Sequence, residues 1–125
     1  MQHAANAYTK VARTALSPRE AEAAVLLKAS TRLQSLREEA VPGSRALNEA
    51  LAFNQKVWTV LSSGVNEPAN AVPEEIRTGV NRLAIFVFRT ILDTMVDPSA
   101  RKLDTLVALN NHLAAGLRGD PGPAV

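Results

Sequence analysis

The sequence contains no cysteine, only 4% aromatic residues, and no long uninterrupted apolar run. Without cysteine, neither a disulfide framework nor a thiolate metal site can form, which fits a reducing compartment. The apolar run Leu83–Phe88 is far shorter than the roughly 20 residues that a membrane span needs. The first residues lack a basic head followed by an apolar core, so no secretory signal is expected and the cytoplasm is the predicted location.

What the chain does contain is apolar residues at helical spacing. Its 125 residues are 46% hydrophobic, enough for one domain with a real core. Proline and glycine lie between periodic segments, and alternating β-branched runs are scarce, so we predict an all-α bundle of about five helices. The expected helices are residues 4–16, 18–41, 44–63, 73–96 and 98–117. Residues 1–117 would form one domain, followed by a disordered tail, 118–125.

Residues 73–96 are predicted to form the central helix of this bundle, because their apolar residues make two adjoining stripes. The first stripe is Ile76, Val80, Leu83, Val87 and Ile91, and the second is Ile85, Phe88, Leu92 and Met95 or Val96. Two stripes predict contacts on two sides of the helix. Pro73 suits the first helical turn, and Glu74 and Glu75 face the positive end of the helix dipole.

Polar residues interrupt the apolar seams of the other helices. Asn54 lies four residues before Trp58, the only tryptophan, so both share one helical face. Asn110 occupies the middle of the last seam, and a buried amide without partners would cost about 1–3 kcal/mol. We predict a buried polar and aromatic joint of Asn54, Trp58, Asn70, Arg77 and Asn110. Alternatively, each asparagine satisfies its own local backbone, and Arg77 anchors either the loop or a neighbouring carboxylate.

Helix ends and surface residues give further expectations. Ser44 is predicted to cap its helix, Gly64 to end that helix, and Asp97 with Pro98 to start the last one. Tyr8 and Glu22 are the residues expected to meet a partner. Glu22 lies on an apolar seam, either at its solvated end or paired with an arginine or backbone amide of a neighbouring helix.

The sequence contains few patterns of residues that are typical of catalytic or ligand-binding sites. We find no His-x-x-x-His spacing, no glycine-rich phosphate loop and no paired carboxylates on an apolar face, so we expect no catalytic, metal, cofactor or small-molecule site. The net charge is only +2, and the basic residues are interspersed with acidic ones rather than gathered in one block. The few aromatic residues lie on apolar seams. Direct RNA binding is therefore permitted but not favoured. A bundle with apolar seams suits helix-in-groove binding of a protein partner.

Several ordered motifs resemble one known family. They are the run Phe53–Leu61 with Asn54 and Trp58, the run Asn70–Arg77, the apolar run Leu83–Val87, the pairs Ala7-Tyr8, Leu109-Asn110 and Gly116-Leu117, and the stretch Ser17–Glu22 followed by Leu33. Together they are similar to the bacterial flagellar biosynthesis regulator FlaF family over roughly residues 7–117. Two positions depart from the family pattern: Val72 stands where leucine is usual, and Thr90-Ile91 replaces an expected His-Thr pair.

The resemblance implies a cytoplasmic, non-enzymatic factor needed for flagellin production. It implies action with the regulator FlbT on flagellin synthesis and binding of flagellin before export, as a chaperone-like factor. The alternative is a post-transcriptional regulator of flagellin mRNA that acts directly or through FlbT. None of these roles follows from periodicity, which contributes only a cofactor-free helical bundle able to accept an amphipathic segment.

Overall fold

The computed structural model describes residues 18–119, and these form an all-α bundle, as predicted. The described α-helices are α2 (Pro18–Ser35), α3 (Arg45–Asn66), α4 (Glu74–Val96) and α5 (Ala100–Leu117). Two short 3-10 helices, η1 (Arg37–Glu39) and η2 (Pro68–Asn70), lie in the connections before α3 and α4. The predicted helix at residues 4–16 and the predicted tail from residue 120 onward lie outside the described residues.

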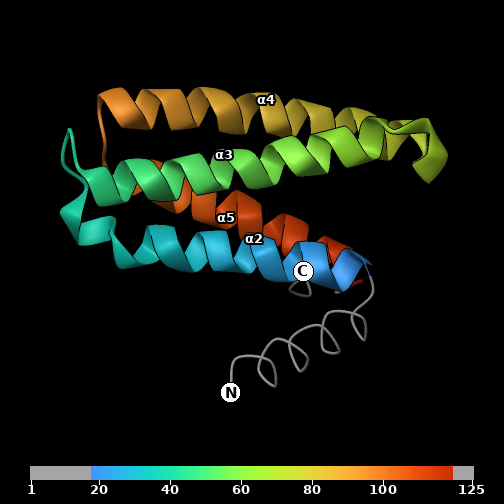
Figure 1. Ribbon diagram of the computed structural model, residues 1–125, viewed down its shortest axis with the longest axis horizontal. Coiled ribbons are helices and arrows are strands. Elements are labelled where there is room, and N and C mark those ends of the chain that lie inside the picture. The colour runs from blue at the N-terminus through green and yellow to red at the C-terminus, as the bar shows by residue number, and fades with distance from the viewer. Residues whose placement is uncertain (1–17, 120–125) are drawn as a thin grey trace, which may run out of the picture.

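Each of the four described helices packs against two others, and α3 lies between α4 and α2. Helix α2 in turn packs along α5 (Figure 1). Trp58 of α3 is fully buried and is the largest such side chain in the core. Leu26 and Leu33 of α2 and Leu103 and Leu106 of α5 complete much of the same core. All four described helices therefore enclose the core, to which α4 contributes Ala84, Val87 and Ile91.

The expectation that residues 73–96 form the central helix is corrected by this arrangement. The first apolar stripe of α4 faces α3 through buried residues such as Val80, Val87 and Ile91. The second stripe is divided: Phe88 and Met95 pack against the core, whereas Ile85, Leu92 and Val96 are 52%, 61% and 80% exposed. Helix α4 therefore lies at the side of the bundle, with an apolar outer surface.

The ends of two helices differ from the prediction, whereas one predicted cap is confirmed. Helix α2 stops at Ser35, and the chain continues as η1, where Arg37 makes a bidentate pair with Asp104 of α5 at 2.8 and 3.0 Å. Helix α3 continues through Gly64 to Asn66, whose side chain donates to the carbonyl of Ser62 at 2.7 Å. Ser44 caps α3 by accepting from the amide of Leu47 at 3.2 Å, as predicted.

The start of α5 is set by Ser99 rather than by Asp97 and Pro98. Ser99 has extended backbone geometry, and its hydroxyl accepts from the amide of Lys102 at 3.2 Å. Asp97 instead ends α4, where its amide donates to the carbonyl of Asp93 at 2.9 Å. The two helices are thus joined by a short turn, and Lys102 bridges it through ion pairs with Asp93 and Asp97 at 3.0 and 3.3 Å.

Replacing Ser99 with alanine tests this cap. Ser99→Ala should lower the free energy of unfolding by about 0.5–2 kcal/mol, because the amide of Lys102 loses its acceptor. Ser99→Asp keeps an acceptor and should stay close to the wild type. Urea unfolding followed by circular dichroism measures both. Equal stability of the alanine and aspartate variants would contradict the assigned cap.

Candidate functional site

A buried hydrogen-bonded cluster joins α3 to α5. The indole Nε1 of Trp58 donates to Oδ1 of Asn110 at 2.7 Å, and Nδ2 of Asn110 donates to Oδ1 of Asn54 at 2.6 Å. All three side chains are fully buried. The spacing of four residues on α3 places Asn54 and Trp58 one turn apart, so one amide from α5 can reach both.

The structure brings together three of the five residues expected in this joint. Asn70 lies apart from it, because its side chain is exposed and donates to the carbonyl of Gly64 at 2.7 Å. Arg77 is half-buried near the start of α4 and makes no side-chain hydrogen bond or ion pair within residues 18–119. Including Asn70 in a buried joint was therefore wrong: it satisfies its local backbone, which was the alternative reading.

A second polar link between helices was missed from the sequence. Asn81 of α4 and Asn66 of α3 exchange amide hydrogen bonds at 2.8 and 3.0 Å, and Ser62 donates to Asn81 at 3.2 Å. Asn81 lies one turn before Ile85, so it continues the second apolar stripe towards the start of α4. Its pairing depends on which face of α3 lies opposite, and a sequence pattern does not specify that.

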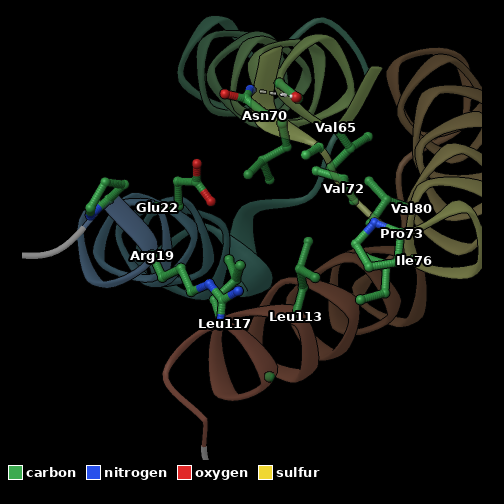
Figure 2. Close-up of a pocket in the computed structure, with 15 residues that line it drawn as sticks. Arg19, Glu22, Val65, Asn70, Val72, Pro73, Ile76, Val80, Leu113 and Leu117 are labelled. Carbon is green, nitrogen blue, oxygen red and sulfur yellow. Dashed lines mark hydrogen bonds between the residues drawn. The ribbon is translucent and has the colours of Figure 1, made fainter. Parts of the chain in front are cut away.

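An apolar groove of about 600 Å³ opens at the end of the bundle where α3 gives way to η2. Figure 2 shows side chains from four helices and the η2 loop converging on it. Its apolar lining includes Leu61, Val65, Val72, Ile76, Val80, Leu113 and Leu117, and its polar lining includes Arg19, Glu22 and Asn70. The groove thus collects the residues that connect α3 to α4, which the sequence motifs had singled out.

The wall formed by residues 70–73 is held in an unusual backbone conformation. Ala71 has a φ of 48°, in the left-handed region that costs a non-glycine residue of the order of 1 kcal/mol or more. Its amide donates to the carbonyl of Pro68 at 3.1 Å, and the preceding side chain of Asn70 ties the loop to Gly64. This geometry turns Val72 and Pro73 towards the groove (Figure 2).

Glu22 is the acidic group of the groove. It projects from α2 near Arg19 (Figure 2), and it also lines a shallower depression of about 350 Å³ between α2 and α3. Burial against the apolar lining raises the pKa of Glu22 above its ordinary value of 4.5, and the positive charge of Arg19 opposes that shift only partly. Although its side chain is exposed, no described cation forms an ion pair with it. The other predicted partner-binding residue, Tyr8, lies outside the described residues.

The fold and the groove define a class of protein: an all-α bundle with a polar joint in its core and an apolar groove at one end. Within residues 18–119, none of the helices is long and apolar enough to cross a membrane, and no group of side chains could hold a metal ion. The sequence model of the family described as Flagellar protein FlaF matches residues 4–117. The chain therefore belongs to the FlaF family of flagellar proteins. No curated protein and no solved structure matches the chain significantly.

Truncating Asn110 tests the buried joint. Asn110→Ala should lower the free energy of unfolding by about 2–4 kcal/mol, because it leaves both the indole N–H of Trp58 and Oδ1 of Asn54 buried without partners. Asn54→Ala should cost less, since it leaves only Nδ2 of Asn110 without its acceptor and removes an Nδ2 that has no hydrogen-bond partner among the described residues. Chemical unfolding monitored by Trp58 fluorescence gives both values. An Asn54→Ala cost equal to or above that of Asn110→Ala would contradict the central role of Asn110.

Replacing Glu22 with glutamine tests its desolvation. A raised pKa means that the folded protein holds the proton on Glu22 to a higher pH than the unfolded chain does, so the contribution of Glu22 to stability falls as pH rises above 4.5. Glu22→Gln has no such proton, so its stability relative to the wild type should increase from acidic to neutral pH. Thermal unfolding across that range measures the difference. Glu75→Gln, which removes a favourable charge at the start of α4, is a matched control and should be less stable than the wild type at neutral pH. A gain for Glu22→Gln that shrinks as pH rises would overturn this account.

Proposed function

We propose that this protein binds flagellin through the apolar groove, as a chaperone-like factor that promotes flagellin synthesis and export in the cytoplasm. The observation that supports this proposal is the groove itself, in a chain that belongs to the FlaF family. Exposed apolar side chains that line a concave surface are typical of helix-in-groove recognition, in which an amphipathic helix inserts apolar anchors one turn apart.

The shape and charge of the groove favour an apolar helix with a basic residue. Leu113, Leu117 and Ile76 lie around one open space, so a helix can be contacted from α4 and α5 together (Figure 2). Glu22 is partly desolvated, the nearby Arg19 offsets its charge only in part, and a lysine or arginine of the partner would complete the counter-charge. Binding, rather than catalysis, is the activity that such a lining supports, because it offers one carboxylate and no second reacting group.

A direct action on flagellin mRNA finds less support. Lys28 and Arg32 stack over the ring of Phe53, with their charged ends 5.8 and 4.8 Å from its centre. The ring is therefore already covered by the chain's own cations and cannot stack on a base without displacing them. Contact with the regulator FlbT remains compatible with either role. Any RNA binding would have to weaken steeply with added salt, and its absence at low salt would eliminate this role.

Two isoleucines of α4 provide a matched test. Ile76 and Ile85 are similarly exposed, at 55% and 52%, but only Ile76 lines the groove. In titration calorimetry with flagellin, Ile76→Asp should weaken binding by about tenfold or more, because it places a charge in the apolar contact. Ile85→Asp should change the affinity by less than about twofold.

The same titrations decide the proposal. If the wild type does not bind flagellin or its isolated terminal segments, the proposed function fails. If both isoleucine variants weaken flagellin binding equally, flagellin binds but not through the groove. Circular dichroism of both variants confirms that each remains folded before its affinity is interpreted.

A further inference from the structure

The outer side of α4 carries a second surface, away from both the groove and the core. Its residues follow an alternating spacing of four and three, which is the seam pattern of a helix that packs along another helix. We call this surface the outer seam; it consists of Thr78, Arg82, Ile85, Arg89, Leu92 and Val96. All six residues are exposed, and Phe86 beside them is 50% exposed. The seam is about 27 Å long, the length of five helical turns.

Two arginines lie inside this apolar seam. Arg82 and Arg89 are seven residues apart, so they point to the same side at a separation of about 10 Å. Within residues 18–119 neither makes an ion pair or a side-chain hydrogen bond. Covering Ile85 and Leu92 with another surface would desolvate both guanidinium groups, which is unfavourable unless that surface supplies carboxylates.

This requirement distinguishes the possible occupants of the seam. The first 17 residues of the chain contain Lys10 and Arg13 but no aspartate or glutamate, so they cannot supply the counter-charge. A second copy in parallel would set Arg82 against Arg82. The same spacing continues back to the exposed Glu75, but an antiparallel copy that paired Glu75 with Arg89 would still set Arg82 against Arg82. A membrane-surface helix carries its basic residues on the polar face beside the apolar one, whereas these arginines alternate with the apolar residues within one seam.

We propose that the outer seam of α4 is a docking surface for an acidic amphipathic helix of another protein. The partner helix would present apolar residues to Ile85, Leu92 and Val96. Its carboxylates, repeated every seven residues, would pair with Arg82 and Arg89. This surface is separate from the groove, so the proposal does not depend on flagellin binding.

Synthetic peptides of defined charge test the proposal. The probe is a labelled peptide of about four heptads with leucine at every d position and glutamate at every a position, and its control has lysine in place of glutamate. Fluorescence anisotropy against the full chain should show at least about tenfold tighter binding of the glutamate peptide at low salt. The double variant Arg82→Glu with Arg89→Glu should reverse this preference. The double variant Arg101→Glu with Arg118→Glu makes the same charge change away from the seam and should retain it.

Other results would overturn the proposal. Binding of neither peptide, equal binding of both, or a charge reversal without effect would each exclude an acidic helix as the occupant. Self-association in sedimentation that Ile85→Asp abolishes would assign the seam to a second copy. Binding to phosphatidylcholine and phosphatidylglycerol vesicles that requires Arg82 and Arg89, without binding of the glutamate peptide, would assign it to lipid. Ile76→Asp, in the groove, should leave binding of the glutamate peptide within about twofold of the wild type.

Discussion

The need to pair a buried indole and two buried amides constrains the whole bundle. Trp58, Asn110 and Asn54 form one chain of hydrogen bonds between α3 and α5, in a core where each unpaired group would cost about 1–3 kcal/mol. Sliding α5 along α3 by a single residue would turn the amide of Asn110 away from both partners. The joint therefore fixes a register that interchangeable leucines alone would specify weakly. Because α2 packs along α5, its position follows from the same register.

The position of the groove is explained by the way α4 is attached to the other helices. Helix α4 packs chiefly on α3. Asn81, in the second turn of α4, is hydrogen-bonded to Ser62 and Asn66 in the last turns of α3. Those bonds hold the start of α4 to the end of α3, and the η2 loop extends beyond them. Meanwhile α2 and α5 remain together as a pair. The groove lies between these two pairs, and the loop at Ala71, with its positive φ, places Val72 in the groove lining.

Much of the fold follows from the sequence, because helical periodicity, proline and capping residues are local signals. The four described helices and the Asn54, Trp58 and Asn110 positions on their buried faces agree with those signals. Local signals do not decide between two alternatives that suit the sequence equally well. Either stripe of α4 could have faced α3, and both Asp97 and Ser99 can cap a helix. The groove itself was not predictable, since Leu61, Ile76 and Leu117 meet only after three helices have packed.

The two surfaces of α4 carry opposite electrostatic requirements. Ile76 and Val80 face the groove, where Glu22 provides a negative charge that Arg19 offsets only in part, whereas Arg82 and Arg89 lie on the outer side without described counter-charges. A helix suited to the groove needs a basic residue, and the same residue would be repelled by the outer seam. An acidic helix suited to the seam would in turn be repelled by Glu22. Electrostatic complementarity of this kind selects between partners more than it adds affinity, because mismatched charges are costly to desolvate. One amphipathic helix therefore cannot satisfy the charges of both surfaces equally, and the apolar residues that α4 leaves exposed lie on two electrostatically distinct surfaces.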